Sequence, residues 1–369
     1  MSTANRFVLA AVAAMAGTVL AHAQVKISLP DDSPVTLVTA DWGDTKTSER
    51  GGALVVELRS VMSLRNTSGK RVRGLTMLVA SQEVTPGGRA SVTRPSLDVA
   101  PGENFPVKID LRLLRPLQKG TGPLVEITLD GVLFDDLSFY GPNRFESRRA
   151  LTAWELEAQR DRRWFRQVLE RDGPDGLRRE CVASLARQAE TQRLDVQLAR
   201  GQRVTAEPMR KLDLAFLRLP DAPVDAIGGA ALVSSGLATV THVDVVNHSD
   251  RAVRSVEIGW MLRDSRGRDY SAGAMPAGIN LAPKARSQVR QDGQLKFTEI
   301  GGGPVSIDSM TAFVSQVEFG DGSLWVPARL ALNDAVLRKA MSPSGEEQRL
   351  TSIYRKRGMQ ALLEELKRF

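Results

Sequence analysis

The sequence contains few cysteine, histidine and aromatic residues. Among its 369 residues are one cysteine, three histidines and 5% aromatic residues. The single cysteine, Cys181, excludes a disulfide within the chain, so the fold must depend on burial of apolar residues. Its helical spacing from Leu177 and Leu185 predicts a small buried residue rather than a reactive thiol. After His22 only two histidines follow, too few for a zinc site of three or four ligands, and we expect no cofactor.

Several catalytic motifs are absent as well. Residues 301–304 are glycine-rich but lack the lysine and following helix of a phosphate-binding loop. His242 and Asp244 would share one strand face with Ser249 nearby, yet no nucleophile-elbow motif accompanies them. The paired carboxylates of a glycosidase could be drawn from Glu57, Glu126, Glu257 and Glu318. A solvated strand face explains both sets, so we predict that the protein is not an enzyme.

Charge of either sign is not concentrated anywhere along the chain. The formal net charge is +7, and basic residues are interleaved with acidic ones, as in residues 160–163. Nucleic-acid binding needs a clustered basic face, ideally with stacking aromatic residues. We therefore expect no nucleic-acid partner, while the positive charge favours weak attraction to anionic envelope polymers or lipid headgroups.

The N-terminus has the pattern of a secretory signal peptide. Arg6 precedes an apolar stretch of 15 residues (7–21), and Ala21-His22-Ala23 supplies small residues for a signal peptidase. This stretch is shorter than the ~20 residues that span a bilayer, which argues against the alternative of an uncleaved anchor. The sequence predicts a signal peptide over residues 1–23, cleavage near Ala23-Gln24, and a periplasmic or extracellular protein. We expect no transmembrane segment in the mature chain.

The most informative feature that is present is an internal repeat. Three segment pairs match in the same order: residues 66–73 with 247–254, 97–101 with 279–283, and 132–142 with 317–327. Their offsets are 181, 182 and 185, which indicates a duplicated domain. The repeated residues are typical of strands and turns.

Both copies have the pattern of short strands separated by turns. Met62 and Leu64 alternate with Ser63 and Arg65, which predicts a half-buried strand, and polar turn residues follow at once. Turn signals every dozen or so residues, without alternating helices, favour an antiparallel sandwich. The expected fold class is therefore mainly β: two antiparallel Ig-like β-sandwiches, a helical connector and a C-terminal helix.

Two segments have helical composition instead. Residues 145–200 are rich in helix-forming residues, and Asp172-Gly173-Pro174 predicts a break between two helices in a hairpin or elbow. Ser344 can cap a last helix, in which Gly358 predicts a second break. Its apolar face could dock on a domain, a partner chain or a membrane surface. The predicted parts are a sandwich over 24–143, a connector over 144–205, a sandwich over 206–340 and an amphipathic helix over 341–369.

Tyr140 and Trp325 occupy the same position in the two copies. An aromatic residue there can pack on the core, or it can form a platform on which a sugar stacks. Tyr140 and Trp325 are therefore the candidate ligand contacts of the sequence, and no catalytic, cofactor-binding or metal-binding residue is predicted.

The repeat unit resembles a known kind of module. Asn-x-Ser, a polar turn, a valine-containing strand and an Ala-Pro turn follow one another at Asn66, Val72 and Pro101, and again at Asn247, Val253 and Pro283. This is similar to bacterial immunoglobulin-like modules of the CARDB or fibronectin-like type, which implies sandwiches used for spacing or binding outside the cytoplasm. We expect a non-enzymatic exported scaffold or binding protein whose partner is an envelope protein or polymer. The alternative is an envelope carbohydrate-binding module or glycan-active enzyme.

Overall fold

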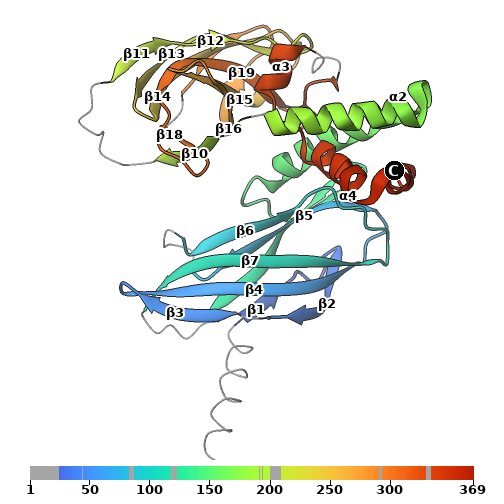
Figure 1. Ribbon diagram of the computed structural model, residues 1–369. Helices are drawn as coiled ribbons and strands as arrows, with labels where there is room; N and C mark the ends of the chain where they lie inside the picture. Colours follow the sequence, from blue (N-terminus) through green and yellow to red (C-terminus); the bar gives the residue numbers. More distant parts are fainter. Residues whose placement is uncertain are drawn as a thin grey trace, which may run out of the picture. The chain divides into compact units, whose positions relative to one another are not determined.

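The computed structural model describes residues 25–43, 45–82, 87–117, 123–190, 192, 194–199, 209–290, 293–329 and 334–369 (Figure 1). The predicted signal peptide and its cleavage site lie outside the described residues. The chain is mainly β, with several sheets, a long helix and a C-terminal helix, which confirms the predicted fold class. It divides into two compact units, Met1–Glu155 (unit 1) and Leu156–Phe369 (unit 2).

Unit 1 is a sandwich of two sheets. One sheet has the order β1-β8-β5-β6 with β9 also paired to β8, and the other has the order β2-β4-β3 with β7 paired to β4. The strands are β1 (Val25–Ser28), β2 (Val35–Asp41), β3 (Lys46–Arg50), β4 (Ala53–Asn66), β5 (Val72–Ala80), β6 (Arg89–Arg94), β7 (Asn104–Pro116), β8 (Val125–Phe134) and β9 (Phe139–Tyr140). Met62 and Leu64 of β4 share one buried cluster with Leu75 and Met77 of β5. The predicted alternation along β4 therefore places its apolar face between the sheets.

Unit 2 repeats this plan. Its sheets have the orders β10-β18-β14-β13-β11, with β17 paired to β14, and β12-β19-β15-β16, with β20 paired to β19. The strands are β10 (Leu194–Ala199), β11 (Arg210–Asp213), β12 (Ala215–Phe216), β13 (Val224–Ser234), β14 (Leu237–Asn247), β15 (Val253–Asp264), β16 (Asp269–Leu281), β17 (Arg286–Val289), β18 (Gln294–Glu299), β19 (Ile307–Phe319) and β20 (Leu324–Trp325). Val243 and Val245 of β14 share the core with Ile258 and Trp260 of β15.

Among its described residues, each sandwich also contains one parallel strand pair that the sequence pattern did not predict. In unit 1, β1 runs parallel to β8. In unit 2, β12 runs parallel to β19. β1 (Val25–Ser28) alternates apolar and polar residues and β12 (Ala215–Phe216) has only two residues, but alternation within one strand does not show whether its partner runs parallel or antiparallel.

The long helix α2 (Ser147–Glu190) is interrupted as predicted. Gly173 has φ 68° and ψ −171°, which is not a helical conformation, and Pro174 follows it directly. A left-handed φ favours glycine, and proline suits the first turn of the next segment. Phe165 before the kink shares one apolar cluster with Leu177 and Cys181 after it, so the two segments of α2 contribute to the same core.

One part of the predicted helical connector is a strand. Leu194–Ala199 forms β10, which pairs antiparallel with β18, so the prediction of a helical connector over 144–205 is wrong for these residues. The reason can be seen in the sequence, since Leu194, Val196 and Leu198 alternate with polar residues. Because residues with high helix propensity flank this segment, the change from helical spacing to two-residue alternation was overlooked.

The C-terminal helix α4 (Gly345–Lys367) begins at Ser344, whose Oγ accepts a hydrogen bond from the Glu347 amide at 3.0 Å. It is kinked at Gly358, where φ is 83°. Leu350, Leu362 and Leu366 pack in the cluster that includes Cys181. Burial raises the pKa of the Cys181 thiol to about 12. The apolar face of α4 thus docks on α2 of the same chain.

A short helix, α3 (Ala335–Ala340), lies between β20 and α4 and is capped by the Asp334 side chain. Within the described residues, no helix combines the length and apolarity needed to cross a membrane.

Candidate functional site

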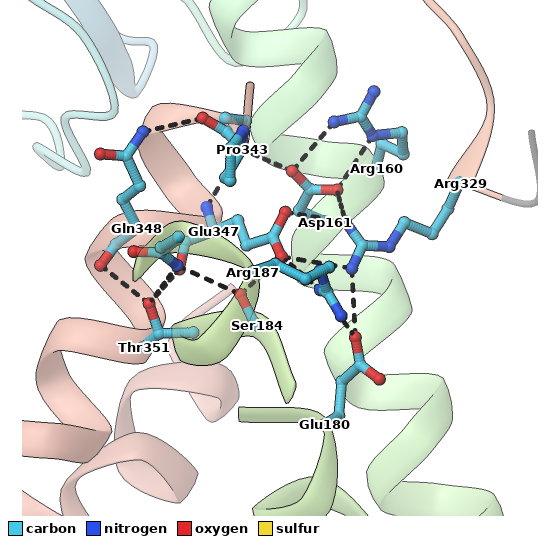
Figure 2. A network of polar contacts seen from close by, with 12 residues as sticks. Arg160, Asp161, Glu180, Ser184, Arg187, Arg329, Pro343, Glu347, Gln348 and Thr351 are labelled. Atoms are coloured by element: carbon cyan, nitrogen blue, oxygen red, sulfur yellow. Dashed lines mark hydrogen bonds and ion pairs between the residues drawn. The ribbon is translucent and has the colours of Figure 1, made fainter. Parts of the chain in front are cut away.

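A buried network of charged side chains lies in unit 2 where α2 meets α4 (Figure 2). At its centre, Arg329 donates to Glu347 at 2.9 Å, to Glu180 at 3.1 Å and to Asp161 at 3.4 Å. Asp161 is fully buried. Arg329 therefore joins both segments of α2 to the first turn of α4. We call this set, with Arg160, Ser184, Arg187 and Ser344, the helical network.

The remaining contacts of the helical network satisfy its acidic groups. Asp161 accepts two hydrogen bonds from Arg160, at 2.9 and 3.0 Å, and one from Ser344 at 2.5 Å. Glu347 accepts hydrogen bonds from Ser184 at 2.6 Å and from Arg187 at 2.8 Å. Burial opposes ionisation of Glu347, but Arg329 and these donors hold its pKa at about 2. The network thus resembles a structural ion cluster, whose acids are already paired.

A small cavity of about 40 Å³ adjoins the helical network. Its lining includes Glu157, Arg160, Arg187, Arg329, Arg338, Met341, Ser342, Pro343, Ser344 and Glu347. Burial, with Asp161 and Glu257 nearby, raises the pKa of Glu157 to about 7, although Arg160 opposes the shift. Glu157 is therefore an acid of this unit that titrates near neutral pH.

A larger cleft of about 570 Å³ lies beside this cavity in unit 2. Its lining includes Arg187, Glu190, Gln192, Gly267, Arg268, Asp269, Ser271, Arg338 and Lys339. These residues come from the end of α2, Gln192 just after it, the turn between β15 and β16, the start of β16, and α3. Four of the side chains are cationic and two are acidic, so the wall has a positive excess. We refer to this site as the cationic cleft.

The cations of the cleft are held in different ways. Arg268 pairs with Asp264 at 2.7 Å and with Glu299 at 2.6 Å. Arg187 belongs to the helical network. Arg338 and Lys339 are exposed, and in the described part of the chain neither makes an ion pair. Two cations are thus fixed by the fold, and two face solvent.

Unit 1 has a smaller hollow of about 300 Å³ over β2, β4 and β7. Arg59 and Asp110 form an ion pair of 3.7 Å in its lining, which also includes the exposed Val61. The opposed charges of this hollow leave it without the positive excess of the cationic cleft.

Tyr140 and Trp325 lie in β9 and β20, in different units. Each is half-buried and packs against the core of its own sandwich. The Tyr140 hydroxyl also donates to Asp32 at 2.7 Å. Core packing accounts for an aromatic residue at this repeat position, and the role of Tyr140 and Trp325 as ligand contacts stays a prediction.

His242, Asp244 and Ser249 do not form a catalytic triad. His242 Nε2 lies 4.0 Å from Asp244, but the Ser249 hydroxyl donates to Asn247 at 2.7 Å. His248 pairs with Asp225 at 3.0 Å. Among the described residues, no group of three or more histidine, cysteine, aspartate or glutamate side chains could hold a metal ion.

The repeated residues form the same polar clamp in both units. The Asn66 amide donates to the Lys70 and Val99 carbonyls at 2.9 and 3.1 Å. Lys70 then reaches Asp136 of the closing hairpin at 2.7 Å. In unit 2, Asn247 donates to the Arg251 and Ala282 carbonyls at 2.7 and 3.1 Å, and Arg251 pairs with Asp321 at 2.7 Å. The duplicated residues therefore close each sandwich.

Sequence reasoning missed the helical network and the cationic cleft. One signal was present, since Asp161 follows Ala158 and precedes Phe165 on the buried face of α2. A charged residue on an apolar stripe indicates a buried partner. No comparable signal identifies Arg329 or Arg338.

Comparison with known proteins assigns no family to the chain. No protein-family model matches it, and no curated protein matches it. Among solved structures, an allantoicase has 8% identity over 76% of this chain and 83% of its own, with a TM-score of 0.09. A vicilin from Corylus avellana (hazelnut) has 9% identity over 76% of this chain and 85% of its own, with a TM-score of 0.07. These likenesses carry no argument about fold or function.

Proposed function

We propose that this is a non-enzymatic, exported binding protein of the cell envelope, with the sandwiches as scaffold and the cationic cleft as its ligand contact. The observation that carries the proposal is the cleft itself, of about 570 Å³. Pockets that bind small molecules have volumes of roughly 300–1,000 Å³. The cleft is also built from α2, α3 and a strand turn rather than from the duplicated clamp, so it belongs to what distinguishes unit 2.

A pull-down from envelope extracts tests this proposal. Gln192 is exposed and lines the cleft, so Gln192→Trp should fill it and abolish capture of the partner. Gln360→Trp on the exposed part of α4 is the matched control and should retain capture. Absence of any retained envelope component, or equal capture by both variants, would count against the proposal.

A glycan array separates the proposal from the carbohydrate alternative. Glycan binding that disappears in Tyr140→Ala or Trp325→Ala would favour a carbohydrate-binding module. Turnover of any polysaccharide by the purified protein would contradict the non-enzymatic proposal.

A further inference from the structure

We infer that the cationic cleft binds an acidic segment of a polypeptide, with Arg338 and Lys339 as the residues that contact its carboxylates. The inference rests on the proposed function and names the chemistry of the ligand. It begins from the two cations of the cleft that face solvent. Arg338 and Lys339 are neighbours in the last turn of α3, and both line the cleft. In the described part of the chain neither forms an ion pair. Asp269 is already paired with Arg263 at 2.8 Å, and Lys339 adds only a weaker attraction to that carboxylate. Arg338 and Lys339 can therefore each form an ion pair with a ligand.

The other two cations of the cleft are neutralised by carboxylates of the fold. Arg187 is held at 2.8 Å from Glu347, and Arg268 at 2.6 Å from Glu299. Because these carboxylates already balance them, Arg187 and Arg268 position the wall rather than supply free charge. The net attraction for an anion therefore comes from α3.

The acidic residues of the lining restrict which anions can bind in the cleft. Glu190 lies in the same cleft and would repel a polymer that carries a charge on every repeat unit, whereas the charge of Asp269 is balanced by Arg263 at 2.8 Å. Isolated carboxylates separated by uncharged groups avoid this repulsion. A polypeptide segment with spaced acidic residues fits the lining better than a polyphosphate does.

The uncharged residues of the lining can bind the main chain of a peptide. Gln192 supplies an exposed polar side chain, and Gly267 is exposed, with no atom within 4 Å of where a Cβ would lie. The Ser271 hydroxyl is within 3.1 Å of the Ser342 hydroxyl, which holds this wall to the segment before α4. Such groups can exchange hydrogen bonds with amides between the acidic residues.

The experiment selects random short peptides displayed on phage against the mature protein. We expect the wild-type pool to be enriched in aspartate and glutamate, and the Arg338→Glu/Lys339→Glu variant to select lysine and arginine instead. A synthetic peptide from the wild-type pool should bind this variant about tenfold more weakly or worse, because two exposed ion pairs become repulsive. Fluorescence anisotropy at two salt concentrations measures the affinity.

A matched control removes the effect of net charge. Lys356 and Arg357 are likewise adjacent and exposed on a helix, so Lys356→Glu/Arg357→Glu makes the same charge change away from the cleft and should leave the peptide affinity unchanged. Circular dichroism checks that both variants fold.

Three results would overturn the inference. They are a wild-type pool without acidic enrichment, equal weakening in the control variant, and displacement of the peptide by inorganic polyphosphate at lower charge concentration. If Gln192→Trp still abolished capture of the envelope partner, the proposed function would survive this failure. If neither experiment depended on the cleft, both would fail.

Discussion

Units 1 and 2 share the same polar clamp, but the equivalent arginine of each unit differs in its exposure and its partners. Arg73 and Arg254 occupy matching repeat positions. The side chain of Arg73 is 13% exposed and pairs with Asp98 at 2.7 Å and with Glu155 of α2 at 3.8 Å. The side chain of Arg254 is 68% exposed and lies 3.8 Å from Glu318. The start of α2 covers one sheet of unit 1, whereas the matching position of unit 2 faces solvent.

The residue after each arginine supports this contrast. Gly74 lies beneath Leu151 of α2, where a Cβ would come within 2.6 Å of the leucine side chain. The matching residue in unit 2 is Ser255, which has room for its side chain. Duplication thus explains the turns and core strands that the two units share. The residues that differ between the units are explained by the contacts that each unit makes with helices. The cationic cleft belongs to these differences.

The largest expected effect tests whether the two cores are equivalent. Val72→Asp and Val253→Asp should each destabilise their own unit by on the order of 4 kcal/mol, because a carboxylate is buried without a partner. Both valines are almost completely buried. Differential scanning calorimetry should show one early transition in each variant. Val61→Asp is the control, because Val61 is 47% exposed, and it should change stability by less than about 1 kcal/mol.

The next effect concerns unit 2 alone. Glu347→Ala should reduce the free energy of unfolding by about 3–5 kcal/mol, because it removes a buried carboxylate that pairs with the partly buried Arg329 and Arg187. The folded pKa of Glu347 is about 2 against an ordinary 4.5, so its stabilisation is complete above pH 4.5 and is lost as the pH falls through 2. The gap between wild type and variant should therefore shrink in acid. An unchanged melting temperature, as expected for the exposed control Glu364→Ala, would contradict this.

Glu157 should have the opposite pH dependence. Its folded pKa is about 7 against an ordinary 4.5, so the folded chain binds a proton more tightly than the unfolded chain. Wild-type stability should fall as the pH rises from 4.5 to 7, by up to about 3 kcal/mol. Glu157→Gln cannot ionise, and it should match wild type near pH 4.5 but exceed it at pH 8. Thermal melts across this range measure the difference, and parallel curves would contradict it. Glu364→Gln should follow wild type throughout.

The same elements show which parts of the structure could be predicted from the sequence and which could not. Alternation identified β4, the repeat identified its counterpart in the second copy, and glycines identified both helix kinks, because each of these signals can be read directly from the sequence. The strand β10 was missed because its period-two pattern is short and lies beside strong helix formers. The cationic cleft joins residues as distant as Arg187, Gly267 and Lys339, and no local pattern encodes which side chains converge. The helical network was partly visible at Asp161, but its partner Arg329 lies in a loop segment without periodicity.

The smallest effect tests the shared clamp. Asn66→Ala and Asn247→Ala should each cost about 2 kcal/mol, because each removes a buried amide that donates two hydrogen bonds to main-chain carbonyls. Calorimetry should give similar costs in the two units, since the hydrogen-bond lengths agree closely. Asn66→Asp and Asn247→Asp are informative controls, because aspartate keeps the acceptor for the amides of Ser68 and Ser249 but loses both donors. If one asparagine were dispensable, the repeated pattern would close one sandwich only, and the match between copies would not reflect a shared structural requirement.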